Sequence, residues 1–236
     1  MEPEEAFPYK APDALTKKKY AKIFEIKETL KPRLFKLLFD KLASSIILII
    51  ASPILILIKV AYLVEGLIIP ENSGPMFFFY NAVSGGKIIK KYKIRLIKSS
   101  FIDPELAKLN DWKAYSKEWS PKSRTYVGTF VKKFYLDELP QFYSILKGDM
   151  SFVGPRPLAI IHYERDLAQG NVTRRLLKGG MLGLGHINKG TTEMGNPIYE
   201  YEYLDKYISL SSFELLCLDL LIIWRGIILV LKGGGY

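Results

Sequence analysis

The sequence predicts an α+β protein that is mainly helical, with a membrane re-entrant helix–break–helix hairpin, interfacial amphipathic helices and a small β-sheet or hairpin. Three observations lead to this prediction. Residues 42–64 are apolar with Ser52-Pro53 at their centre, strand-like segments lie on either side of a glycine turn at residues 84–87, and aromatic residues interleave with lysines over residues 101–121.

Composition limits the class of protein. A chain of 236 residues is long enough for one ordinary domain, which we place at residues 36–236 after an N-terminal basic extension at residues 1–35. The net charge of +10 favours polyanionic partners, although no recognised module supports nucleic acid as one. Because Cys217 is the single cysteine, no intrachain disulfide forms. His162 and His186 lie far apart in the sequence, so a zinc site is not expected.

The apolar stretch is long enough to reach across a bilayer, because a straight helix over residues 42–64 would be roughly 35 Å long. Pro53 removes an amide donor at the centre, which predicts a break or a sharp kink. Lysine and arginine residues crowd both flanks, and the positive-inside rule then places both ends in the cytoplasm. A re-entrant hairpin satisfies that rule, whereas a proline-kinked single transmembrane helix is the alternative. About forty polar residues precede the stretch and no cleavage site follows it, so we do not expect a signal peptide.

The middle of the chain reads as strands and an aromatic segment. Residues 76–80 and 88–97 are strand-like, and Ser84-Gly85-Gly86-Lys87 between them predicts a tight connection. Lys91, Lys93 and Arg95 would share one face of the second strand, where solvated surface and phosphate contact are both open. Trp112, Tyr115 and Trp119 fit either an amphipathic helix at a lipid headgroup layer or core packing.

Two adjacent carboxylates, Asp137 and Glu138, stand at a predicted helix start. If Asp137 caps the helix, the helix runs to Lys147 and ends at Gly148, which is also ordinary helix capping without function. A helix N-terminus nevertheless favours phosphate. One carboxylate there would face a phosphorus atom while the other binds Mg²⁺, which prefers carboxylates and substrate phosphates.

Arg156 lies between Pro155 and Pro157, and the following proline favours an extended backbone at the arginine. A guanidinium presented in this way can grip phosphate oxygens in bidentate fashion, although a structural salt bridge is the simpler alternative. The glycine-dense segment 179–185 matches neither a P-loop nor a dinucleotide fingerprint and is interpreted as a loop.

The C-terminal segment 210–232 is apolar but contains Glu214, Asp219 and Arg225, which are costly at a bilayer centre. It is therefore predicted to be a packed or amphipathic helix at the interface rather than a second span. Upstream, Asp205 is an acidic residue in an aromatic setting, for which a surface ion pair is the plain alternative.

These motifs together resemble one family. The run Leu136-Asp137-Glu138-Leu139-Pro140-Gln141, the segment Leu146–Ser151 and the run Val153-Gly154-Pro155-Arg156-Pro157 resemble the bacterial sugar transferases, which are monotopic phosphoglycosyl transferases. The resemblance covers roughly residues 36–232 and includes Ser52-Pro53, residues 73–75 and 92–95, and the positions Gly183, Asn188, Asp205 and Asp219.

The resemblance implies transfer of a phospho-sugar from a nucleotide diphosphate sugar, typically a UDP-sugar, to polyprenol phosphate such as undecaprenyl phosphate. Asp137 would form a covalent phospho-sugar intermediate and release UMP in a ping-pong scheme, and Glu138 would bind Mg²⁺. Phosphate-binding roles would fall to Arg156, Lys93 and Lys132, with Asp205 as a further acidic residue of the site. The fold would lie at the cytoplasmic face of the bacterial cell membrane. The sequence is compatible with a homodimer and equally with other oligomeric states.

The chain departs from the family pattern at several positions. Lys132, Ala82 and Thr129 stand where arginines are common, Gly179 replaces a proline, and His186 replaces a glutamine. A lysine at position 132 keeps the charge but not the planar fork of a guanidinium. Because Asp137, Glu138 and Arg156 persist, the sequence predicts an active transferase; a membrane scaffold that kept the fold without the chemistry is the alternative.

Overall fold

A computed structural model describes residues 10–185, 193 and 195–231. The described part of the chain divides into two compact units: the first contains residues 43–81 and 90–146, and the second contains residues 10–42 and 82–89 and the described residues of 147–231. The helices are α1 (Ala14–Lys19), α2 (Ala21–Phe24), α3 (Leu34–Ile68), α4 (Pro104–Lys108), α5 (Tyr126–Lys133), α6 (Gln141–Lys147), α7 (Ile160–Ala168), α8 (Thr173–Leu176), α9 (Ile198–Ser209) and α10 (Ser212–Leu231). The strands are β1 (Phe77–Ser84), β2 (Lys87–Ile94), β3 (Ser151–Val153), β4 (Leu158–Ala159) and β5 (Gly180–Leu182). Short 3₁₀ turns occur at Pro70–Asn72, Ser99–Phe101, Trp112–Trp119, Pro121–Ser123 and Leu136–Glu138. The chain is therefore mainly helical with small sheets, as predicted.

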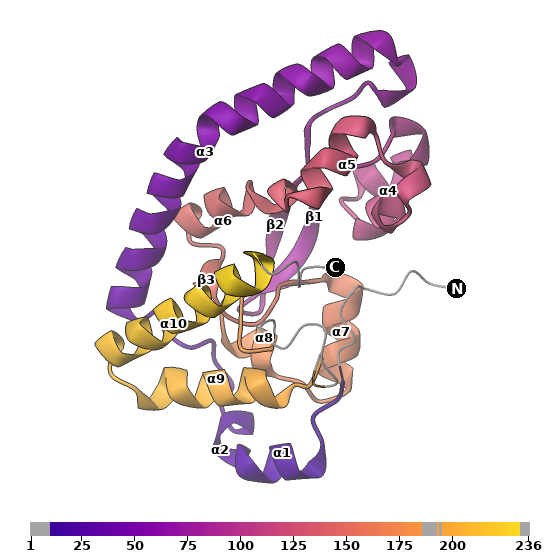
Figure 1. The fold of residues 1–236 in the computed structure, drawn as a ribbon. Coiled ribbons are helices and arrows are strands. Elements are labelled where there is room, and N and C mark those ends of the chain that lie inside the picture. The colour runs from indigo at the N-terminus through magenta and orange to yellow at the C-terminus, as the bar shows by residue number, and fades with distance from the viewer. Residues whose placement is uncertain (1–9, 186–192, 194, 232–236) are drawn as a thin grey trace. The chain divides into compact units, whose positions relative to one another are not determined.

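The apolar stretch forms one continuous helix, α3, which Figure 1 draws as an unbroken ribbon. By length and composition α3 can cross a membrane, since its most apolar 18-residue window has a mean hydropathy of 2.6 and is 17% buried. The sequence predicted a break or a sharp kink at Ser52-Pro53, and the break is wrong at the level of secondary structure, because Pro53 lies inside the helix. The Pro53 nitrogen cannot donate to the Ile49 carbonyl four residues earlier, and the Ser52 hydroxyl donates to that carbonyl instead at 2.8 Å. The helix therefore continues through Pro53, and the re-entrant topology remains a proposal.

The predicted glycine connection between two strands is confirmed. β1 ends at Ser84, β2 begins at Lys87, and Gly85 and Gly86 have φ of 57° and 71°. Positive φ at both central residues is the conformation that the right-handed twist of a two-residue hairpin requires. β4 adds to the other edge of β1 in the order β2-β1-β4, antiparallel, with Ala82 opposite Ala159. A separate two-stranded sheet pairs β3 with β5 in parallel, with Ser151 opposite Gly180.

The core of the first unit joins α3, the end of β2 and α5. It consists of buried apolar side chains, namely Ile58, Tyr62, Met76, Ile94, Leu96, Ile97 and Val131. Burying each large apolar side chain contributes roughly 1.5–3 kcal/mol. α5 lies close against the chain after β2, because a Cβ at Gly128 would stand 2.0 Å from the Leu96 carbonyl oxygen.

A carboxylate joins the end of α3 to the start of α5. Glu65 accepts hydrogen bonds from the amides of Tyr126 and Val127 at 2.7 and 3.0 Å, and from the Asn72 side chain at 2.7 Å. The first amides of a helix have no partner within the helix, so an anion from another element satisfies them and interacts favourably with the helix dipole.

The aromatic segment is not one amphipathic helix. Asp103 caps α4 through its side chain, and Asn110, with φ of 55°, separates α4 from the 3₁₀ turn at Trp112–Trp119. Trp112 is buried and the Tyr115 ring stacks on Phe78 at 3.8 Å, so these two pack into the unit. Trp119 is 46% exposed.

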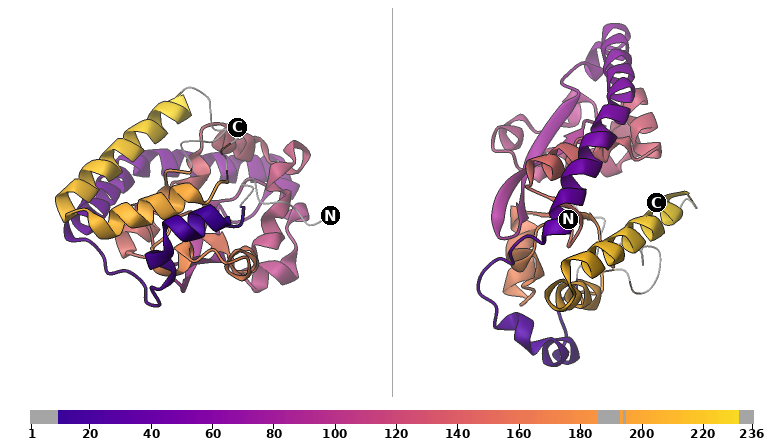
Figure 2. Two further views of the ribbon diagram at one scale, coloured as in Figure 1. Left: turned by 90° about the horizontal axis from the view of Figure 1, so that it is seen from below. Right: turned by 90° about the vertical axis from the view of Figure 1, so that its left-hand side faces the viewer.

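In the second unit, α1 and α2 lie beside α9 (Figures 1 and 2). Phe24 stacks on Tyr201 at 5.0 Å between ring centroids, so the N-terminal segment shares a core with α9. α10 packs through Leu215, Asp219 and Ile222, which are buried, as predicted for a packed C-terminal helix. Its exposed side chains include Phe213 and Trp224, so the helix also has an apolar solvent-facing side.

Candidate active site

The two adjacent carboxylates lie in the 3₁₀ turn at Leu136–Glu138, between α5 and α6. The prediction that Asp137 caps a continuous helix is wrong, because Tyr135 occupies the cap position with left-handed φ of 55° and α6 begins only at Gln141. A left-handed conformation at a non-glycine residue is costly, and such strain concentrates at functional sites. The predicted end of the helix is confirmed, since α6 ends at Lys147 and Gly148 has φ of 93°.

Asp137 is a buried carboxylate between two lysines. It is 1% exposed, and its Oδ2 atom lies 3.3 Å from the Lys93 Nζ and 3.6 Å from the Lys132 Nζ. Within the described residues neither Asp137 oxygen accepts a hydrogen bond. Buried carboxylates are normally hydrogen-bonded. Asp137 instead keeps its lone pairs available, while the two lysines balance its negative charge. Three residues singled out from the sequence are thus together in the first unit.

Glu118 is a member of the site that sequence reasoning missed. Both its carboxylate oxygens accept from the Lys93 Nζ, at 2.9 and 3.0 Å. Lys93 therefore lies between Glu118 and Asp137. The only signal in the sequence was an acidic residue beside Trp119, and nothing in its spacing connects it with a lysine 25 residues earlier.

The charges in this cluster support one another. Burial lowers the pKa of Lys93, but the carboxylates of Glu118 and Asp137 raise it by more, so the net direction is upward and the ammonium form is stabilised. Burial likewise raises the pKa of Glu118, but Lys93 and Lys132 lower it by more, so the carboxylate form is stabilised. The predicted basic face is buried rather than solvated, since Lys91 and Lys93 of β2 and Arg95 just after it are 2%, 4% and 1% exposed.

Lys132 comes from the last turn of α5, and its ammonium also stands 4.7 Å from the centre of the Trp119 ring. A cation over an indole face is held by the ring quadrupole. Arg95 has a structural role, because its guanidinium donates to the carbonyls of Asn72, Pro75 and Ile97.

Glu138, the predicted Mg²⁺ ligand, is half-buried beside Asp137. Over residues 10–185, 193 and 195–231, no group of three or more His, Cys, Asp or Glu side chains is arranged to hold a metal ion. Mg²⁺ in phosphate-handling sites is often held by one or two carboxylates with substrate phosphates and water. A single carboxylate such as Glu138, which lies beside Asp137 where the substrate phosphates would bind, fits that mode.

Arg156 and Asp205 belong to the second unit. Arg156 follows β3 in a half-buried position. Asp205 is exposed on α9, where its backbone carbonyl accepts from the Ser209 hydroxyl at 2.8 Å. His186 and Asn188 lie outside the described residues.

Comparisons with known proteins agree with the motifs. A family model described as bacterial sugar transferase matches residues 31–233. A UDP-glucose:undecaprenyl-phosphate glucose-1-phosphate transferase of Klebsiella pneumoniae is 38% identical over 164 residues, which are 67% of this chain and 32% of that protein. A UDP-N-acetylgalactosamine-undecaprenyl-phosphate N-acetylgalactosaminephosphotransferase of Aeromonas hydrophila is 30% identical over 203 residues, 83% of this chain and 43% of that protein. The chain thus spans 32% and 43% of the length of these two relatives. The family match covers most of the chain, and the chain belongs to the bacterial sugar transferase family.

Proposed function

We propose that this chain transfers a phospho-sugar from a UDP-sugar to polyprenol phosphate, the first membrane step in assembling a glycoconjugate or exopolysaccharide. An Asp137 carboxylate oxygen attacks the phosphorus atom that bears the sugar. A new bond forms between this oxygen and the phosphorus, and the bond from phosphorus to UMP breaks. The phosphate of the polyprenol then attacks the same phosphorus, which frees Asp137 and gives polyprenyl-diphosphate-sugar.

The observation that carries this proposal is the state of Asp137. Its oxygens accept no hydrogen bond within the described residues, and it is buried between Lys93 and Lys132. A carboxylate nucleophile needs available lone pairs, and a diphosphate substrate needs nearby positive charge. Family membership and the names of the relatives support the same reaction class.

Other residues supply the remaining functions. Lys93 and Lys132 attract the diphosphate and reduce its repulsion from Asp137. Arg156 binds phosphate oxygens through its planar fork, and Asp205 is a further acidic residue of the site. Glu138 is the residue that would hold Mg²⁺, which when bound neutralises charge on the phosphates.

The acceptor is a lipid phosphate, so the site works beside a membrane. α3 carries many exposed apolar side chains, among them Ile49, Ile50, Leu57 and Leu67 at 72%, 67%, 69% and 84% exposure. Exposed apolar surface of this extent is expected to be covered by lipid. We place the chain at the cytoplasmic face of the bacterial cell membrane, with α3 entering and leaving on that side.

The test of the nucleophile is the Asp137→Asn variant of the full chain in lipid nanodiscs, supplied with UDP-sugar and polyprenol phosphate. We expect UMP release to fall by at least about a thousandfold, because an amide oxygen is a poor nucleophile. Mass spectrometry of the wild-type chain with UDP-sugar alone should find a phospho-sugar adduct on Asp137. The control is Glu105→Gln, an acid-to-amide change at an exposed residue that pairs with Lys108 at 2.7 Å.

Undiminished UMP release by Asp137→Asn would rule out this nucleophile. Absence of UMP release by the wild-type chain with every UDP-sugar supplied would instead support the alternative, a membrane-associated scaffold that retains the fold. The names of the two relatives refer to UDP-glucose and UDP-N-acetylgalactosamine, so these two donors come first in the screen.

A further inference from the structure

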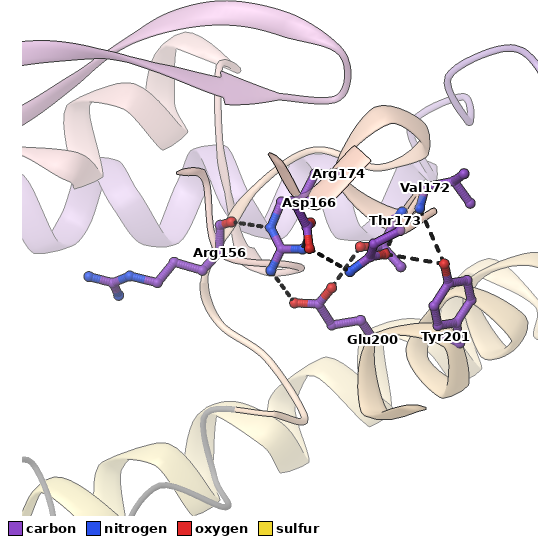
Figure 3. Close-up of polar contacts among 8 residues, drawn as sticks. Arg156, Asp166, Val172, Thr173, Arg174, Glu200 and Tyr201 are labelled. Atoms are coloured by element: carbon purple, nitrogen blue, oxygen red, sulfur yellow. Dashed lines mark hydrogen bonds and ion pairs between the residues drawn. The ribbon is translucent and has the colours of Figure 1, made fainter. Parts of the chain in front are cut away.

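A buried polar cluster in the second unit adjoins Arg156 but was not singled out from the sequence as a unit. Figure 3 shows its side chains around a central arginine, Arg174 of α8. The other members are Asp166 of α7, Asn171 in the turn before α8, Thr173 of α8, and Glu200 and Tyr201 of α9.

The guanidinium of Arg174 makes three directed contacts. It is 1% exposed, donates from Nη1 to Asp166 at 2.6 Å and from Nη2 to Glu200 at 2.5 Å, and donates from Nε to the backbone carbonyl of Arg156 at 3.0 Å. A planar guanidinium with fixed donor directions allows these three bonds together, which a single ammonium cannot reproduce.

The carboxylates that orient Arg174 are themselves held. The Thr173 hydroxyl donates to Glu200 at 2.6 Å, and the Asn171 amide donates to Asp166 at 3.3 Å. The Tyr201 hydroxyl in turn donates to the Asn171 side-chain oxygen at 3.2 Å. Burying one cation with two carboxylates is costly, and well-packed apolar residues often stabilise a fold equally well. The ionic cluster therefore points to a requirement for geometry.

The geometry in question is that of the backbone in the loop between β3 and β4, which contains Arg156. The loop is held at successive positions, because Lys36 donates to the Val153 carbonyl at 2.9 Å and Gly180 donates to the Pro155 carbonyl at 2.8 Å. Flanking prolines leave the loop without amide donors at Pro155 and Pro157. The bond from Arg174 to the Arg156 carbonyl continues this series, and Figure 3 shows the Arg156 side chain directed away from the cluster.

We propose that Arg174 is a positioning residue for Arg156. It fixes the carbonyl of Arg156, and thereby the direction in which the Arg156 guanidinium is presented to the phosphates of the UDP-sugar. This inference rests on the proposed function, in which Arg156 binds substrate phosphate.

The experiment is a double-mutant cycle on the full chain in nanodiscs, with kcat and KM for the UDP-sugar measured from UMP release. The variants are Arg174→Lys, Arg156→Ala and the combination. We expect Arg174→Lys to raise KM by about tenfold or more with a smaller change in kcat, because charge is kept while orientation is lost. In the Arg156→Ala background the same change should alter KM less than about twofold, since the residue that it orients is absent.

Arg175→Lys is the matched control. The Arg175 guanidinium donates to the Ile26 carbonyl at 3.0 Å, and this bond involves neither Arg156 nor the cluster carboxylates. It should leave KM near the wild-type value. If thermal unfolding shows that Arg174→Lys does not fold, Glu200→Gln replaces this variant in the cycle. The substitution keeps the side-chain shape of Glu200 but removes the charge of one of the two carboxylates that orient Arg174.

The outcomes separate the two proposals. Equal effects of Arg174→Lys with and without Arg156 overturn the positioning role while leaving the proposed function in place, and so does an Arg174→Lys chain with wild-type KM. A wild-type chain without UMP release, or an Arg156→Ala variant with unchanged KM and kcat, overturns the phosphate-binding role on which the inference rests.

Discussion

Lys93 is the residue on which the charges of the candidate site converge. Its ammonium touches Glu118 at 2.9 Å and Asp137 at 3.3 Å, and all three side chains are largely withdrawn from water. A buried ion pair is strongly destabilising when one partner alone is removed. Glu118 therefore stabilises the unit as well as setting the charge of the site.

A pH-dependent stability difference follows for Glu118→Gln. The folded-state pKa of Glu118 is lowered, because Lys93 and Lys132 outweigh the effect of burial, so its contribution to stability is present above the unfolded pKa and is lost as pH falls through the folded pKa. We expect the variant to be less stable than wild type by about 2 kcal/mol at pH 7, and the difference to shrink as pH falls below about 4. Urea unfolding in detergent, at pH 7 and at a pH below about 4, measures this difference in stability. Glu105→Gln serves as the exposed control, and a difference of equal size at both pH values would contradict the assignment.

At the scale of elements, polar contacts hold α5 at both of its ends. Its first amides donate to Glu65 of α3, and its last turn carries Lys132 toward Asp137. The 3₁₀ turn with Asp137 follows directly. Contacts at the start of α5 are thus expected to affect the site at its end.

We predict that Glu65→Ala costs about 2–4 kcal/mol of unfolding free energy, because it leaves two helix amides and the Asn72 side chain without their charged acceptor. UMP release should fall with it, as α5 no longer starts at a fixed point. The matched change is Glu71→Gln, which removes an exposed pair with Lys98 at 2.7 Å and should cost less than about 1 kcal/mol. Equal losses in the two variants would show that the Glu65 contacts have no special weight.

For the molecule as a whole, net charge and apolar exposure favour the same partner. The chain carries a net charge of +10, and α3 exposes apolar side chains on a helix long enough to cross a bilayer. In the proposed membrane setting, anionic lipid would attract the first and cover the second. Both features therefore favour a lipid partner for α3.

We predict that both ends of α3 are cytoplasmic. Single cysteines at the exposed positions Lys18 and Lys90, in a Cys217→Ser background, should react with a membrane-impermeant maleimide from the same side. Pro53→Ala restores an amide donor to the Ile49 carbonyl and should move part of the population to opposite-side labelling, because a straighter helix favours spanning. Opposite-side labelling of the unmodified helix would refute the re-entrant arrangement.

The sequence by itself determined the features that depend on near neighbours. The Gly85-Gly86 turn, the helix end at Gly148, the apolar helix and the packed helix near the C-terminus all follow from local backbone preference or from hydrophobic content. The motifs around Asp137 and Arg156 also identified the family. The sequence misplaced what depended on competition between local signals, as at Asp137, where Tyr135 takes the cap position.

Only the tertiary structure decided the contacts that join distant residues. It brought Glu118 to Lys93 across 25 residues and Arg174 to the Arg156 carbonyl across 18. It also placed the Ser52 hydroxyl where the helix lacked a donor, so α3 continues through Pro53. Long-range ion pairs form because burial makes an unpaired charge too costly, and which charges become buried together depends on how the elements pack.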